Sequence, residues 1–167
     1  MQQKGYQAKN MIIDIRKANY SGPLSVLPFM VLTFWVYDNV NGFDLDDISL
    51  VFALSAFLLI LCLTILHELI HGIIWNSFSA YCTCSEPLKK WQYLLGIVMP
   101  TLILGVGATA ASVVTNQLLL FFLSEFMIIS GGGDFLITLK TLLYHTDKKE
   151  TLYCDHPYEC GFVVFEK

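Results

Sequence analysis

Four long apolar stretches set the strongest limit on how this chain can fold. They cover residues 23–37, 48–78, 93–114 and 118–144. A helix needs roughly 20 apolar residues to cross a bilayer, so the last three stretches are long enough and the first is short. The sequence therefore predicts an all-α membrane protein, a bundle of about four transmembrane helices in which the first stretch either crosses or is re-entrant.

Composition supports the lipid bilayer as the main partner. Of the 167 residues, 55% are hydrophobic and 14% are charged, about half the charged fraction of a soluble domain. The first residues lack the apolar core of a cleaved signal peptide. A net charge of -4 without a dense Lys and Arg cluster argues against nucleic acid as a partner. We expect one membrane domain over residues 1–167.

The charges also predict an orientation, because Lys and Arg collect in cytoplasmic loops near the ends of spans. Basic residues precede the first stretch, separate the second from the third, and follow the fourth: Lys4, Lys9, Arg16, Lys17, Lys89, Lys90, Lys148, Lys149 and Lys167. The loop 38–47 is acidic and the turn 112–117 is neutral. Four spans with both termini in the cytoplasm fit this pattern. The tail segment 161–165 is β-prone and could add one strand.

The second stretch contains His67-Glu68-Leu69-Ile70-His71, an H-E-x-x-H motif. On a helix, residues four apart share a face, so both imidazoles could bind one Zn²⁺. Glu68 would then act as the general base on zinc-bound water. The alternative is a His pair that is satisfied by hydrogen bonds between helices, or one that lines a transport pathway.

A catalytic zinc normally has a third protein ligand. A metzincin is excluded, because Ile74 and Ser77 stand where that class needs Gly and His. Asp134 is the favoured third ligand: it follows three glycines, and at 1.5 Å per residue its depth agrees with that of His67 within about 5 Å. Glu86, in the loop between the second and third stretches, is an alternative third ligand. An Asp that only caps a helix after a glycine break is the other interpretation of Asp134.

Several other residues receive non-catalytic interpretations. Glu125 lies on the face opposite Asp134 if the helix is straight, which suggests packing, a water cavity or substrate access. Cys62 is interpreted as a small core residue. A second zinc site is less expected than separate packing thiols, because the spacings of the other cysteines are unusual for zinc. These are Cys82, Cys84, Cys154 and Cys160. Trp75, Trp91 and Tyr93 lie where aromatic residues anchor spans at the interface.

Together, these motifs resemble a bacterial domain-of-unknown-function family of zincin peptidases. The resemblance runs from Leu61 to Glu166 and rests on the following segments: 67–72, 84–88, Met99-Pro100, Gly132-Gly133-Asp134, 155–157 and Gly161-Phe162. The chain also looks like a distant, compact relative of the site-2 proteases. The resemblance implies zinc on His67, His71 and Asp134, with Glu68 as base, in a bacterial cell membrane. Site-2 proteases place their Asp directly before Gly, in an Asn-Pro context that is missing here.

The sequence thus predicts a zinc-dependent endopeptidase that cleaves a membrane-associated polypeptide near the cytoplasmic face. Such a site needs water, so we expect a cavity open to the cytoplasm near Gly72 and Asp134. The rival hypothesis is a non-enzymatic zinc-binding regulator or transporter component.

Overall fold

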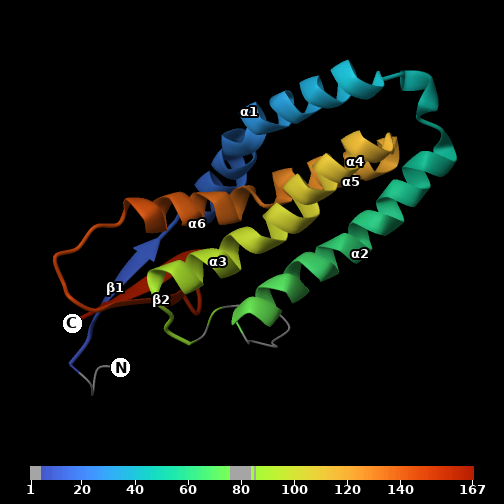
Figure 1. Cartoon of the computed structure of the whole chain (residues 1–167). Helices are drawn as coiled ribbons and strands as arrows, with labels where there is room; N and C mark the ends of the chain where they lie inside the picture. Colours follow the sequence, from blue (N-terminus) through green and yellow to red (C-terminus); the bar gives the residue numbers. More distant parts are fainter. Residues whose placement is uncertain (1–4, 76–83, 85) are drawn as a thin grey trace.

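In the computed structural model, an elongated helical bundle carries a small β-sheet at one end (Figure 1). The structure describes residues 5–75, 84 and 86–167. In chain order the elements are β1 (Gln7–Ile12), α1 (Ile15–Asn41), the 3-10 helix η2 (Leu45–Asp47), α2 (Leu50–Trp75), α3 (Lys90–Pro100), the π-helix η3 (Thr101–Gly107), α4 (Ala108–Thr115), α5 (Leu118–Ser130), α6 (Gly132–Leu143), β2 (Thr151–Asp155) and β3 (Gly161–Glu166). The predicted class, a helical membrane bundle with a short strand-forming tail, is confirmed.

The first helix is much longer than its apolar stretch. α1 has 27 residues and is one of three helices long and apolar enough to cross a membrane. It begins where the Asp14 carboxylate accepts the backbone N–H of Arg16 at 2.9 Å, and it ends at Gly42, whose φ is 75°. Of the two alternatives for the first stretch, its length favours a crossing helix, because polar turns extend the helix beyond its apolar centre at both ends.

The third span contains a stretch of π-helix. α3, η3 and α4 together form a helix over Lys90–Thr115 that could cross a membrane. The π turns begin directly after Pro100, which has no N–H to donate to the regular helical ladder. π segments often occur at functional sites, and residues of this one line an apolar cavity that also reaches Asp134.

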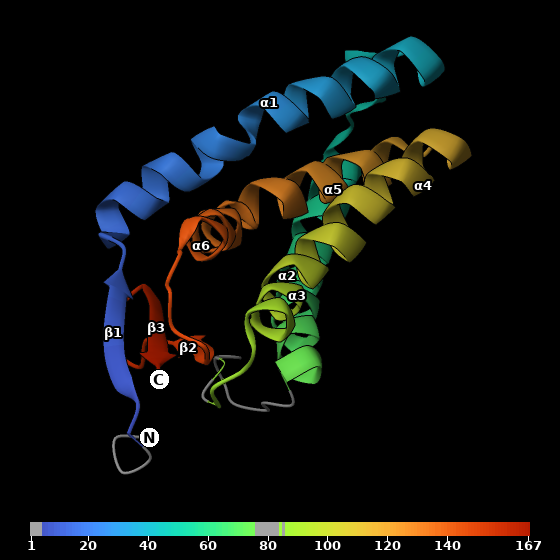
Figure 2. The ribbon, with the colours of Figure 1, turned by 60° about the vertical axis from the view of Figure 1, so that its left-hand side comes forward.

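The fourth span is broken. α5 and α6 meet at 46°, with Gly131 between them. Beyond the break, Gly132 packs so closely against α1 that an added Cβ would collide with the backbone of Gly22 and Pro23. Figure 2 shows how the bend turns α6 away from the direction of α5, and α6 contacts both α1 and α3. The glycines thus bring the helix that carries Asp134 into the bundle.

The sheet has three antiparallel strands in the order β1-β3-β2, where the sequence predicted one. β3 is the predicted strand and occupies the centre, paired with β1 from Gln7↔Glu166 to Ile12↔Gly161. Phe162 and Val164 on β3 are fully buried against Tyr93 of α3 and Tyr153 of β2. This apolar core fixes the sheet to the end of the helices.

The second helix is the least buried of the spans. Its buried residues are His67, His71, Gly72 and Trp75, all near its C-terminal end. The remainder of α2 presents apolar side chains outward. Cys62 is among the exposed residues, so its interpretation as a core residue is wrong.

Candidate metal centre

Three side chains from two helices converge where α2 passes the start of α6. His67 Nε2 lies 3.2 Å from Asp134 Oδ2 and 3.3 Å from His71 Nε2, and His71 Nε2 lies 3.5 Å from Asp134 Oδ2. Both histidines are buried, and Asp134 is partly buried. The triangle brings together the three residues that the sequence favoured as metal ligands.

The size of this triangle fits a zinc ion. Zinc bonds of about 2.0–2.1 Å in a tetrahedral site place neighbouring ligand atoms roughly 3.3–3.4 Å apart. The three measured separations of 3.2, 3.3 and 3.5 Å surround that value. Two imidazole nitrogens and a carboxylate oxygen are also a donor set that zinc accepts in catalytic sites.

The tautomer of His71 is set by its second ring nitrogen. Nδ1 lies 2.8 Å from the backbone carbonyl oxygen of Gly96 in α3. A carbonyl oxygen can only accept, so Nδ1 carries the hydrogen and, in the neutral ring, Nε2 keeps a free lone pair. Second hydrogen bonds of this kind orient histidines that bind metals. His71 is therefore prepared as a ligand.

A stack of four rings holds His71 in place. The His71 imidazole stacks on Trp75 at 5.0 Å between centroids, Trp75 stacks on Tyr93 at 5.9 Å, and Tyr93 stacks on Tyr153 at 6.1 Å. Gly96 leaves room for it, because an added Cβ would collide with the Trp75 indole. The stack reaches from the ligand through α2 and α3 to strand β2.

The stacked rings correct the interpretation of Trp75 and Tyr93 as residues that anchor spans at the membrane interface. Trp75 is 9% exposed and Tyr93 is fully buried, so neither is an interface anchor. Trp91 is 63% exposed and retains that prediction. The sequence signal for the stack was the presence of aromatic residues near both helix ends, but nothing in it showed that they face one another.

Asp155 is a further carboxylate near the site, and sequence reasoning did not single it out. Its Oδ1 accepts the Tyr93 hydroxyl at 2.6 Å, and its Oδ2 accepts the backbone N–H of Cys84 at 2.8 Å. Burial raises the pKa of Asp155 above its ordinary value, against these two hydrogen bonds. Asp155 thus joins β2 to α3 and to the segment that follows α2. The only hint in the sequence was the Asp155-His156-Pro157 segment of the family resemblance.

A polar cavity of about 220 Å³ adjoins the triangle. Glu68, His71 and Asp134 line it from the helices. Asp155, His156 and the loop before β3 line it from the sheet. Glu68 is exposed in the structure of the chain alone. A cavity beside Asp134 is therefore present, and the glutamate of the motif lines it together with His71, whereas Gly72 does not line it. Its opening to the cytoplasm stays a prediction.

Two other acidic residues lie outside the triangle. Glu86 is exposed in the loop before α3 and is not part of the His67, His71 and Asp134 group. Glu125 accepts a 2.6 Å hydrogen bond from Thr33 of α1. Of the three alternatives predicted for Glu125, this contact between α1 and α5 agrees with packing.

The described cysteines form no metal-binding group of three in residues 5–75, 84 and 86–167. Burial, with the nearby Asp155 charge as the next cause, raises the pKa of Cys84 to about 12 and that of Cys154 to about 11. Both are therefore protonated thiols at neutral pH, as packing residues are. Cys82 lies outside the described residues, so the alternative of a second zinc site is untested there.

The fold and the triangle define a class: helical membrane proteins with an H-E-x-x-H motif and an aspartate brought to it by another helix. Residues 60–148, more than half of the chain, match the family described as "Putative zincin peptidase". The chain belongs to this family, whose matched region includes the motif and Asp134. No curated protein and no solved structure matches the chain. The likeness to site-2 proteases therefore stays a prediction.

Proposed function

We propose that this protein is a zinc endopeptidase embedded in the membrane, which hydrolyses peptide bonds of a membrane-associated polypeptide near the cytoplasmic face. The observation that carries the proposal is the triangle of His67 Nε2, His71 Nε2 and Asp134 Oδ2, with sides of 3.2–3.5 Å, next to a cavity lined by Glu68. A zinc peptidase needs this combination of ligands, base and access for water.

Each residue of the site has a distinct role in this proposal. His67, His71 and Asp134 hold the ion, which when bound acidifies a water molecule and polarises the substrate carbonyl. Glu68, one residue after the first ligand, accepts the proton of the attacking water and returns it to the leaving amine. The Gly96 carbonyl and the ring stack keep His71 oriented.

The charges support the proposed orientation of the site. The described Lys and Arg residues belong to the sheet end of the molecule or to the first turns of helices that begin there: Lys9, Arg16, Lys17, Lys89, Lys90, Lys140, Lys148, Lys149 and Lys167. Lys140 Nζ donates to the carbonyl of Ile12 at the end of β1, at 2.9 Å. The acidic segment 38–47, which runs from the last turn of α1 through η2, lies at the opposite end (Figure 1). The positive-inside rule then puts the sheet and the polar cavity on the cytoplasmic side.

The rival is a membrane protein that binds zinc without turnover, and Glu68→Gln separates the two. The full chain would be purified, loaded with zinc, and incubated in detergent with a library of internally quenched peptides. In the peptidase, Glu68→Gln keeps one zinc per chain and loses cleavage by roughly 10²- to 10⁴-fold, the usual contribution of a general base. Glu125→Gln, the matched control on another span, keeps both properties.

Two results would count against the peptidase. Equal cleavage by wild type and Glu68→Gln would identify a contaminating activity. Stoichiometric zinc in a wild-type protein that cleaves no peptide, either in detergent or in vesicles, would favour the binding protein.

A further inference from the structure

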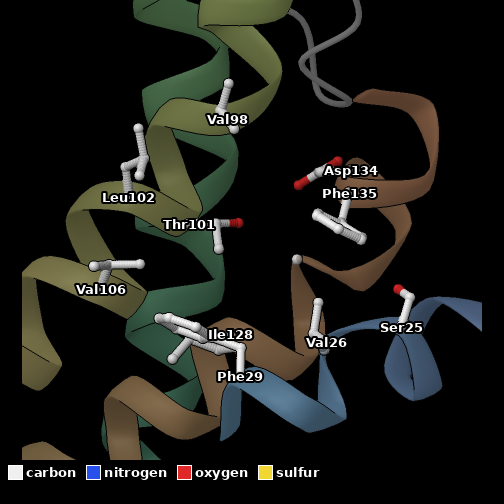
Figure 3. Close-up of a pocket in the computed structure, with 11 residues that line it drawn as sticks. Ser25, Val26, Phe29, Val98, Thr101, Leu102, Val106, Ile128, Asp134 and Phe135 are labelled. Atoms are coloured by element: carbon white, nitrogen blue, oxygen red, sulfur yellow. The ribbon is translucent and has the colours of Figure 1, made fainter. Parts of the chain in front are cut away.

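A second cavity, separate from the polar one, also reaches Asp134. It has a volume of about 430 Å³ and lies between α1, the α3–η3 junction and the bend between α5 and α6. Its lining is almost entirely apolar, with Val26 and Phe29 from α1, Leu102 and Val106 from η3, and Ile128 from α5. Figure 3 shows these side chains around an open space with Asp134 at one end. Asp134 lines both cavities.

The rim of this apolar cavity is on the outer surface of the bundle. Phe29 is 38% exposed, Leu102 is 47% exposed and Val106 is 37% exposed. All three residues lie within helices that could cross a membrane, so lipid surrounds the rim when the protein is inserted. The cavity thus connects the hydrocarbon region to the candidate metal ligand.

One polar atom in the lining has no partner among the residues that the structure describes. Thr101 Oγ1 is buried there without a hydrogen bond to any described residue, where the π-helix begins and beside Gly131 at the bend. An unpaired hydroxyl in apolar surroundings is unfavourable until it finds an acceptor. A polypeptide extended for cleavage has free backbone carbonyls, each of which could accept a hydrogen bond from the Thr101 hydroxyl.

From this geometry we infer that the apolar cavity is a specificity subsite, which takes a large apolar side chain next to the cleaved bond of a membrane-inserted substrate. The inference rests on the proposed peptidase function. The volume of the apolar cavity is within the range of roughly 300–1,000 Å³ typical of ligand sites, which is enough for one large side chain and its flanking backbone. Water then reaches Asp134 through the polar cavity, and the substrate reaches it through the apolar one.

Peptide hydroxamates test this subsite by binding rather than by turnover. A hydroxamate group binds the zinc, and two otherwise identical peptides carry glycine or leucine at the adjacent position. The affinities would be measured with the zinc-loaded full chain in lipid nanodiscs. Burying a leucine side chain should make the leucine peptide bind about 10- to 100-fold more tightly than the glycine peptide.

The chain offers neighbouring variants as test and control. Leu102 lines the cavity, whereas Ile103, which is 46% exposed, does not. Leu102→Trp should fill the space and reduce the leucine preference to less than about threefold, while Ile103→Trp should leave it unchanged. Acetohydroxamate, which has no side chain, should bind all three proteins equally. Phe29→Ala enlarges the space and should favour a tryptophan peptide over the leucine peptide, even if Leu102→Trp fails to fold.

The outcomes separate the subsite from the proposed function. If acetohydroxamate binds and wild type does not distinguish glycine from leucine, the subsite is wrong and the zinc site stands. An equal loss of preference in Leu102→Trp and Ile103→Trp, or an unchanged preference in Phe29→Ala, would place the subsite elsewhere. A protein that holds zinc but binds no hydroxamate, or holds no zinc, would overturn both the subsite and the peptidase.

Discussion

Asp134 and Glu125 are two carboxylates on the same broken span, yet their surroundings differ. Asp134 follows the bend at Gly131 and lies within 3.5 Å of two imidazole nitrogens. Glu125 precedes the bend and accepts one hydroxyl from Thr33. It borders an open apolar groove between α1 and α5. Both are acids in an apolar span, but of the two only Asp134 lies beside the histidine pair.

The difference shows what the bend contributes. Ionisable groups in lipid are costly and usually functional, so composition alone gives the two residues equal interest. The 46° change of direction places α6 against α1 and α3 beside the histidine pair, whereas α5 packs against α1, α2, α4 and η3. Backbone geometry, rather than residue type, thus decides which acid can join a metal site.

Removing the two carboxylates in turn gives the largest expected contrast. Asp134→Ala takes one of three ligands away, and we expect zinc affinity to fall by more than about 100-fold, beyond the effect of altering an outer-shell contact. Glu125→Ala should leave zinc affinity unchanged. Competition with a chelator of known affinity measures both. Similar zinc affinities in the two variants would remove Asp134 from the site.

The bend itself is tested by two adjacent glycines. An alanine at Gly132 would collide with the backbone of Gly22, whereas a Cβ at Gly133 meets nothing within 4 Å. Gly132→Ala should therefore cost about 1–3 kcal/mol of stability and weaken zinc binding, because α6 must move away from α1. Gly133→Ala should be neutral or slightly stabilising, since alanine favours a helix. Thermal unfolding in detergent, with and without zinc, compares them. Equal behaviour would mean that the α1–α6 contact does not position Asp134.

The hydrogen bonds of Asp155 should have a smaller effect. Tyr93→Phe removes the hydroxyl but keeps the ring stack, so we expect a loss of about 1 kcal/mol in stability and a reduction in zinc affinity of only a few-fold. Tyr93→Leu should cost more, because it also removes the stacked ring. A phenylalanine variant as defective as the leucine variant would show that the hydroxyl, and not the stack, is the main support.

The pH dependence of Asp155 follows from its raised pKa. Because the folded carboxyl holds its proton more tightly than the unfolded one, its contribution to stability is greatest below the ordinary Asp pKa. That contribution declines as the pH rises through the interval up to the raised folded value. Asp155→Asn should lack this decline. Thermal unfolding of wild type and Asp155→Asn across acidic pH measures the difference in stability. Parallel stability profiles of the two proteins would contradict the raised pKa of Asp155.

The Thr33 contact should matter least. Thr33→Val removes the hydroxyl that Glu125 accepts and keeps the shape of the side chain, so we expect at most about 1 kcal/mol of lost stability. Zinc affinity should not change. A measurable loss of zinc in the same chelator assay would show that the two carboxylates are coupled along the span.

Residues whose surroundings depend on local spacing were predictable from the sequence. His67 and His71 share a helix face because they are four residues apart, and the depth estimate placed Asp134 near them. The position of Glu125 was also predictable in outline, although a straight helix was assumed and the real span is bent. Hydropathy identified the apolar part of α1 but not its polar ends, because backbone hydrogen bonds continue the helix there.

Residues whose surroundings depend on distant segments were not predictable. β1 is mostly exposed, so its strand lacks a clear apolar pattern, and its partner β3 comes from the other end of the sequence. In the sequence, Trp75 and Tyr93 resemble interface anchors because they lie near the ends of apolar stretches. Their burial depends on the sheet that covers them, which the sequence does not reveal. The hydrogen bonds of Asp155 likewise need three segments to meet, which spacing along one helix cannot reveal.

The central position of β3 has a consequence for the order in which the protein is made. β3 is the last of the described elements to leave the ribosome, yet it pairs with β1, the first. Its Phe162 also packs against Tyr93, one of the four stacked rings. The apolar helices can therefore form before the support of His71 is complete. In a newly made chain, the contacts that orient this histidine would be complete only after β3 has emerged and paired with β1.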